Sequence, residues 1–192
     1  MATRRSKTDR PFTVIVEGNI GSGKTTFLNH LQKHDICVLA EPIEMWRNCN
    51  GNNLLVCFTP DIGGIYCAFQ QGLLYENPTR WSFTFQMYVL LTMARNHALK
   101  TGQPIKVMER SLFSARYCFI EKLASEGSIP APSLCVMDEY FKWICSNSDA
   151  DVDLIGKFYG MCHLIAIVLC EFSQSLISFF WKYTQLLVIL FH

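Results

Sequence analysis

Eight residues near the beginning of the chain have the types and spacing of a phosphate-binding loop. They read Gly-Asn-Ile-Gly-Ser-Gly-Lys-Thr and fit G-x-x-x-x-G-K-[ST] at every fixed position. Glycines let successive backbone N–H groups converge on a phosphate, and a helix that follows offers its positive N-terminal end to the same anion. The alternative is an ordinary glycine-rich turn. We expect the nucleotide-binding residues to be Gly18, Asn19, Ile20, Gly21, Ser22, Gly23, Lys24, Thr25 and Thr26.

Two side chains of this loop have chemistry of their own. Lys24 would reach the β- and γ-phosphates of ATP, and the Thr25 hydroxyl would help to hold Mg²⁺. Glu109 follows the predicted third strand, 105–108, and an acid at that place can hold Mg²⁺ through a water. The sequence therefore predicts ATP and Mg²⁺ as cofactors, with Thr25 and Glu109 on the metal side.

The elements that must position these residues alternate between strand and helix. The run 12–16 is short and β-rich, the helical spacing after the loop ends near Lys33, and 36–40 is a second buried-type run. Such alternation predicts an α/β fold, a parallel sheet with helices on both sides. Ligands bind at the carboxyl ends of the strands in such a sheet.

Two further candidates fall at strand ends. Glu41 directly follows the second strand, where a carboxylate can take a proton from a substrate hydroxyl; the alternative is a helix-initiating residue before Pro42. Arg110 follows the third strand, where it can offset charge on a transferring group. The run 153–155 opens a fourth strand.

A long helix is predicted from Trp81 to Lys100. Its apolar stripe consists of Phe83, Met87, Leu90, Leu91 and Ala94. Gln86 lies on a neighbouring face with Val89 and Met93, and it is the lone amide of an apolar segment. An amide suits the edge of a nucleobase, although an amide bonded to backbone is the common alternative. Helices are also predicted over 112–124 and 134–145.

Composition excludes some classes of protein. The chain has 192 residues and a formal charge of +1, too small an excess for a protein that binds nucleic acid by electrostatics. Nine cysteines, an odd number without a C-x-x-C pair, indicate reduced thiols in an intracellular protein. Residues 1–11 are predicted to be a disordered leader. The sequence favours a cytoplasmic location, with a mitochondrial or nuclear address as the alternative.

Several segments together resemble one family. Residues 18–26, 41–48, 85–86 and 109–117 resemble, in this order, the motifs of the deoxyribonucleoside kinases, in particular the insect multisubstrate and mitochondrial thymidine kinase branches. The resemblance implies a P-loop fold of the nucleoside kinase type, transfer of the ATP γ-phosphoryl group to the 5′-hydroxyl of a deoxyribonucleoside, and a homodimer. It favours pyrimidines such as thymidine and deoxycytidine.

The resemblance also implies roles for individual residues. Glu41 would be the general base, Arg110 would contact the 5′-oxygen, and Tyr75 would contact the 3′-hydroxyl. Gln86 would pair with the base edge. The other residues around the nucleoside would be Trp46, Phe85, Val89, Met93, Ala115 and Phe119.

The chain departs from the family pattern twice. Residues 56–71 interrupt it, and from Gly156 to His192 no arginine stands where the family has an arginine-rich lid helix. We expect a kinase domain over 12–155 with an insertion at 56–71, C-terminally incomplete, and a divergent hydrophobic tail over 156–192. Both segments could be translated intron sequence, which is a hypothesis. The alternatives are a catalytically impaired isoform that binds nucleotide, and a misfolded or tail-anchored product, although membrane contact is disfavoured by Glu171 and Lys182.

Overall fold

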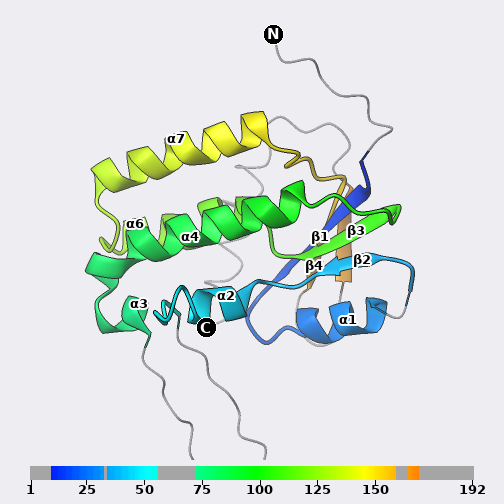
Figure 1. The fold of residues 1–192 in the computed structure, drawn as a ribbon, viewed down its shortest axis with the longest axis horizontal. Helices are drawn as coiled ribbons and strands as arrows, with labels where there is room; N and C mark the ends of the chain where they lie inside the picture. Colours follow the sequence, from blue (N-terminus) through cyan, green and yellow to red (C-terminus); the bar gives the residue numbers. More distant parts are fainter. Residues whose placement is uncertain (1–9, 33, 56–71, 159–163, 169–192) are drawn as a thin grey trace, which may run out of the picture.

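The fold is built on one sheet with a central first strand. The computed structural model describes residues 10–32, 34–55, 72–158 and 164–168. In these residues the strand order is β2-β3-β1-β4-β5, and the first four strands are parallel (Figure 1). The strands are β1 (Phe12–Gly18), β2 (Cys37–Leu39), β3 (Ile105–Glu109), β4 (Leu154–Phe158) and β5 (Leu164–Val168). The predicted parallel sheet is confirmed, and β5 adds an antiparallel edge.

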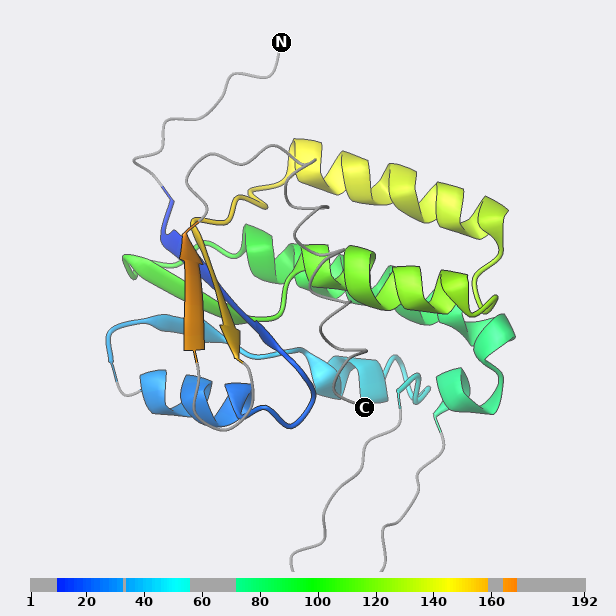
Figure 2. The ribbon, with the colours of Figure 1, turned by 180° about the vertical axis from the view of Figure 1, so that it is seen from behind.

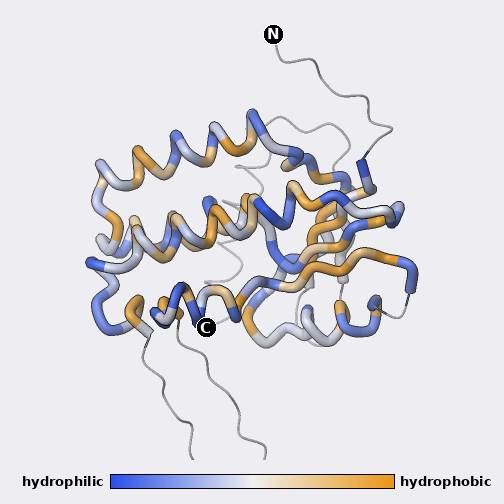
Figure 3. Tube along the Cα trace, in the orientation of Figure 1, coloured by the Kyte–Doolittle hydropathy of each residue, from blue (hydrophilic) through white to orange (hydrophobic). Residues whose placement is uncertain are grey.

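Helices cover both faces of the sheet. On one face α1 (Lys24–Leu31) packs Leu28 against Val16 and Val107. On the other face lie α4 (Pro78–Ala98) and α7 (Ala131–Asn147), which run side by side in both views (Figures 1 and 2). The strands are largely hydrophobic, with hydrophilic residues at some positions, whereas the two long helices alternate between hydrophilic and hydrophobic residues (Figure 3). This is the pattern of a sheet buried on both faces beneath amphipathic helices.

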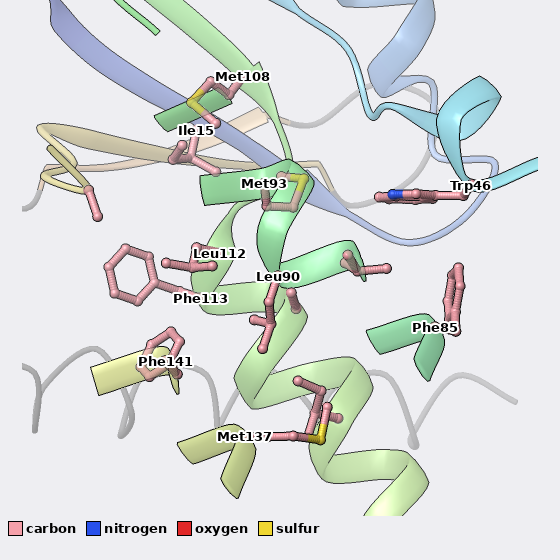
Figure 4. Packing of buried hydrophobic residues seen from close by; sticks show 14 of the residues in the cluster. Ile15, Trp46, Phe85, Leu90, Met93, Met108, Leu112, Phe113, Met137 and Phe141 are labelled. Carbon is pink, nitrogen blue, oxygen red and sulfur yellow. The ribbon is translucent and has the colours of Figure 1, made fainter. Parts of the chain in front are cut away.

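The larger core lies between the sheet and α4. Ile15 and Met108 from the sheet meet Leu90 and Met93 from α4, and Phe141 comes from α7 (Figure 4). The helix begins at Pro78, three residues earlier than predicted, because the Asn77 side chain accepts a hydrogen bond from the Arg80 amide.

The apolar stripe predicted for α4 is only partly buried. Leu91 is half exposed, whereas Gln86, Val89 and Met93 are buried. The face assigned to the substrate is therefore also the face that packs on the sheet side of the molecule. Helical spacing alone fits two neighbouring stripes, and tertiary contacts decide between them.

The segment predicted as one helix over 112–124 is divided. It consists of α5 (Leu112–Ser114), the π-helical turn η1 (Ala115–Ile120) and α6 (Glu121–Ser125). Arg116 within η1 is buried and pairs with Asp138 of α7 and with Glu121. A π-turn inserts an extra residue, so it rotates the side chains that follow relative to those before it.

The first described residues are held to the start of β4. The Arg10 guanidinium bonds both carboxylate oxygens of Asp153 at 2.6 and 2.7 Å, and the Thr13 amide donates to the same carboxylate at 2.7 Å. The prediction of a disordered leader through residue 11 is therefore wrong for Arg10 and Pro11; residues 1–9 lie outside the described residues.

β4 extends past residue 155, the predicted end of the domain. β4 continues to Phe158 in register with Gly18 of β1, and β5 pairs along its whole length with β4. Residues 159–163 and 169–192 of the predicted tail lie outside the described residues.

The residues that flank the predicted insertion are hydrogen-bonded to each other. Residues 56–71 lie outside the described residues, but the chain on either side is hydrogen-bonded across the break. The Leu73 amide donates to the Asn53 carbonyl at 3.0 Å, and the Leu74 amide donates to the Leu54 carbonyl at 3.3 Å. Here the short helix α3 (Leu73–Glu76) adjoins the residues that follow α2 (Ile43–Arg47).

Candidate active site

The phosphate-binding loop has the backbone that its glycines allow. Gly21 and Gly23 have φ values of +77° and +94°, in the left-handed region, and Gly23 is the N-cap of α1. A Cβ at either glycine would meet nothing within 4 Å. The loop therefore leaves open space in front of the first turn of α1, where an anion can meet backbone N–H groups.

Two side chains of the loop are buried. Lys24 is 5% exposed, and its Nζ donates to the carbonyl oxygens of Gly18 and Asn19 at 3.1 and 2.7 Å. Burial lowers the pKa of Lys24, and the positive charge of Arg110 adds to this effect. The Ser22 hydroxyl is buried without a hydrogen-bond partner among the described residues. Both groups are donors that a phosphate would satisfy.

The predicted metal-side residues lie together. Thr25 Oγ1 donates to Glu109 Oε1 at 3.1 Å, which links the first turn of α1 to the last residue of β3. Hydroxyl and carboxylate oxygens are the ligands that Mg²⁺ prefers, and Mg²⁺ keeps several waters when a protein supplies only one or two ligands. No group of three or more His, Cys, Asp or Glu side chains suited to a metal occurs in the described part of the chain.

Glu41 and Arg110 form an ion pair at the carboxyl edge of the sheet. Arg110 Nε lies 3.0 Å from Glu41 Oε1, and both side chains are largely buried. Burial raises the pKa of Glu41, and the Arg110 guanidinium limits the rise. The two residues that sequence reasoning placed after β2 and β3 are therefore in contact, because these strands are parallel neighbours.

Arg110 has an unusual backbone. Its φ of +60° lies in the left-handed region, which costs a non-glycine residue about 1 kcal/mol or more. Its amide donates to the Val16 carbonyl at 3.0 Å, and its guanidinium carbon lies 4.8 Å from the centre of the Phe119 ring. The turn directs the Arg110 side chain between Glu41 and Phe119, a residue predicted to wall the nucleobase.

The other residues predicted to surround a base are buried, and they come from three elements, α2, α4 and η1. Trp46 on α2 meets Phe85 on α4 edge to face, with ring centres 5.9 Å apart (Figure 4). The Trp46 Nε1–H donates to Thr92 Oγ1 at 2.9 Å, which fixes the indole. Val89 and Met93 of α4 and Ala115 of η1 belong to the same core cluster.

Gln86 differs from its apolar neighbours. Its side chain is 3% exposed, and its Oε1 has no hydrogen-bond partner among the described residues. A buried amide oxygen without a partner costs about 1–3 kcal/mol, so its presence in a packed helix calls for a ligand or an ordered water. The common alternative, an amide bonded to backbone, does not account for this oxygen.

Tyr75 is the predicted site residue that the structure does not join to the others. It lies on α3 with a side chain that is 64% exposed. No contact among the described residues connects it to Glu41 or Arg110. Its contact with a sugar hydroxyl stays a prediction.

Sequence reasoning missed Glu17 and gave no role to Ser111. Glu17 is buried in β1, directly before the loop, and accepts a hydrogen bond from Ser111 Oγ at 3.0 Å. Burial raises the pKa of Glu17 to about 7. The available signal was alternation, because Thr13, Ile15 and Glu17 share one face of a strand whose polar members must find partners.

Comparisons with known proteins point to one family. The sequence model of the family described as deoxynucleoside kinase matches residues 14–155. Mitochondrial thymidine kinase 2 of Macaca fascicularis is 40% identical over 148 residues, 77% of this chain and 50% of the macaque protein. The human counterpart is 39% identical over 153 residues, 79% and 52% of the two chains. Deoxycytidine kinase 1 of Xenopus laevis is 32% identical over 158 residues, 76% and 58% of the two chains.

The match covers only part of those proteins. This chain spans about half the length of the mitochondrial thymidine kinases that resemble it. Within the ranges described above, no helix has both the length and the apolar character needed to cross a membrane.

Proposed function

Because this chain belongs to the deoxynucleoside kinase family, we propose that it transfers the γ-phosphoryl group of ATP to the 5′-hydroxyl of a deoxyribonucleoside. The observation that carries the proposal is the Glu41–Arg110 ion pair, which lies at the carboxyl edge of the same sheet as the phosphate-binding loop. We favour thymidine and deoxycytidine as substrates. The mitochondrial thymidine kinases and the deoxycytidine kinase among the relatives support this choice.

Glu41 acts as the general base. Its carboxylate takes the proton of the 5′-hydroxyl as that oxygen attacks phosphorus, and burial strengthens it as a base by raising its pKa. Arg110 holds the carboxylate in place and offsets negative charge on the transferring group. The Glu41–Arg110 contact thereby joins proton removal to charge neutralisation.

The loop binds the phosphates. Lys24 Nζ exchanges its bonds to the Gly18 and Asn19 carbonyls for phosphate oxygens, and residues 18–26 offer N–H groups. Thr25 and Glu109 are the residues that would hold Mg²⁺, which, when bound, neutralises charge on the phosphate oxygens.

Gln86 reads the base. Its amide would form paired hydrogen bonds with a pyrimidine edge, and the rings of Phe85, Trp46 and Phe119 would pack against the base. The small side chain of Ala115 leaves room there. Tyr75 would meet the 3′-hydroxyl.

The test is deoxynucleoside-dependent release of ADP by the purified chain. We expect Glu41→Gln to lower kcat by about 10² or more, because general base catalysis is lost, while thymidine binding persists in calorimetry. Glu44→Gln is the matched control, since Glu44 lies three residues further on and pairs with Arg47 at the surface. Binding of ATP and thymidine without turnover would reject the kinase activity and leave a nucleotide-binding protein.

We also infer a homodimer. One face of α7 is exposed and largely apolar, and it consists of Cys135, Val136, Glu139, Tyr140 and Trp143. Large apolar patches of this kind support association with a second copy. Sedimentation should give a dimer for the wild type and a monomer for Trp143→Glu.

We propose a cytoplasmic location for this chain. The sequence favours the cytoplasm, whereas the names of two relatives include mitochondrial. Fractionation of cells that express the chain with a C-terminal tag distinguishes these compartments from the nucleus.

A further inference from the structure

Glu17 is a buried carboxyl at the centre of the site that takes no part in the chemistry described so far. It is 3% exposed and lies in β1, one residue before the phosphate-binding loop. Charges act on it from Arg110 and Glu41, and the parallel register places Lys157 of β4 beside it. Burying a carboxyl here is costly, so the contacts that it makes there need an explanation.

One hydrogen bond of Glu17 comes from the residue next to Arg110, and a second involves the Ser114 side chain. Ser111 Oγ donates to Glu17 Oε1 at 3.0 Å and accepts a hydrogen bond from the Ser114 amide at 3.1 Å. The Arg110 amide in turn donates to the carbonyl of Val16, the residue before Glu17. The last residues of β1 therefore hold the turn on both sides of the Arg110 α-carbon.

The left-handed turn at Arg110 is unfavourable for the backbone and needs stabilising contacts. A φ of +60° at an arginine is unfavourable, and such a conformation persists only where its surroundings impose it. The same conformation aims the guanidinium at Glu41 and at the face of Phe119. If the turn relaxed toward negative φ, the guanidinium would leave both partners.

We propose that Glu17 is a positioning residue, which holds the left-handed turn at Arg110 through the Ser111 hydroxyl and so places the guanidinium against Glu41. This proposal rests on the proposed kinase function for its effect on turnover. It does not rest on that function for its effect on the turn. The two can therefore be measured separately.

The experiment compares four variants with the wild-type chain by hydrogen–deuterium exchange and by turnover. Glu17→Ala and Ser111→Ala each remove the hydrogen bond between the two residues. Glu17→Gln keeps an acceptor oxygen for Ser111 and removes the charge. Ser82→Ala is the matched control, because it deletes a buried serine hydroxyl on α4 that has no hydrogen-bond partner among the described residues.

We expect exchange at the Arg110 and Ser111 amides to rise about tenfold in Glu17→Ala and Ser111→Ala, the factor that loss of one buried hydrogen bond gives. Glu17→Gln and the control should stay within about threefold of the wild type. In the two alanine variants kcat should fall about tenfold with little change in KM for thymidine, because Arg110 acts on the transferring group. In the double variant the rise in exchange should be smaller than the two single effects combined, because both substitutions remove the same Glu17–Ser111 hydrogen bond.

Unchanged exchange at Arg110 and Ser111 in the alanine variants would overturn the proposal, and so would a glutamine variant that exchanges as fast as the alanine variant. If Glu17→Ala does not unfold cooperatively, Ser111→Ala decides by the same criterion. If the wild-type chain has no turnover, the proposed function fails, and the exchange data still decide whether Glu17 positions the turn.

Discussion

His97 and Glu17 should give the stability of this protein two opposing pH dependences. His97 is 1% exposed on α4, its Nε2 accepts a hydrogen bond from the Leu112 amide, and the Lys106 ammonium bonds its carbonyl oxygen at 2.6 Å. Burial, with the nearby Lys106 charge, lowers the pKa of His97 from 6.5 to about 3. Protonation in the folded state would break the bond to Leu112 and place a second cation beside Lys106.

The sign and size of the change in unfolding free energy follow from the difference in proton binding between the folded and unfolded chains. Between pH 6.5 and about 3 the unfolded chain binds this proton and the folded chain does not, so stability from His97 is lost as the pH falls. At about pH 5 the loss is about 2 kcal/mol of unfolding free energy. Glu17 acts oppositely, since its pKa rises from 4.5 to about 7 and the folded chain binds the proton first. Its contribution grows by about 2 kcal/mol from about pH 7.5 to about pH 5.

Urea unfolding, followed by tryptophan fluorescence at about pH 7.5 and about pH 5, tests the contributions of both His97 and Glu17. The two contributions nearly cancel in the wild type. Relative to it, His97→Gln should gain about 2 kcal/mol on acidification, and Glu17→Gln should lose about 2 kcal/mol. His30→Gln, which removes an exposed histidine of α1, is the control and should follow the wild type. Equal pH dependence of the wild type and His97→Gln would refute the burial argument.

Three further predictions concern the site and the chain around it. Gln86→Leu should raise the unfolding free energy by about 1 kcal/mol, because it removes a buried oxygen that has no hydrogen-bond partner among the described residues. The same substitution should abolish thymidine binding in calorimetry, and retained binding would show that Gln86 does not contact the base. Gly23→Ala should lower the unfolding free energy by about 1–2 kcal/mol and weaken ATP binding, because the φ of Gly23 is +94°. Gly102→Ala is the control and should leave the melting temperature unchanged; equal effects of the two substitutions in thermal melts would contradict this prediction. Deletion of 56–71 should leave the melting temperature within a few degrees, because Leu73 and Asn53 are already hydrogen-bonded; loss of cooperative melting would show otherwise.

Much of the candidate site could be predicted because it is local in sequence. The loop is defined by consecutive residues, and Glu41, Glu109 and Arg110 each follow a recognisable strand. Once the strands are parallel, their carboxyl ends meet at one edge of the sheet. The contact of Arg110 with Glu41 is therefore a consequence of topology and needs no knowledge of side-chain packing.

The rest depends on pairings that sequence patterns do not contain. Asp153 holds Arg10 across 143 positions, so no local signal separated Arg10 from a disordered leader. The π-turn at Ala115–Ile120 has helical spacing in sequence and is distinguished only by its backbone. Leu91 was included in the apolar stripe because two neighbouring faces of α4 are apolar, and contacts with the sheet and α7 decide which of them is buried.

The strand order has a consequence for synthesis on the ribosome. β1 is the first strand to emerge, yet both of its neighbours, β3 and β4, are encoded far downstream. The apolar residues of β1, the central strand, therefore stay exposed during synthesis until β3 and then β4 have been made. We expect nascent chains stalled before residue 154 to be captured by chaperones and to acquire protease resistance only after β4 is released.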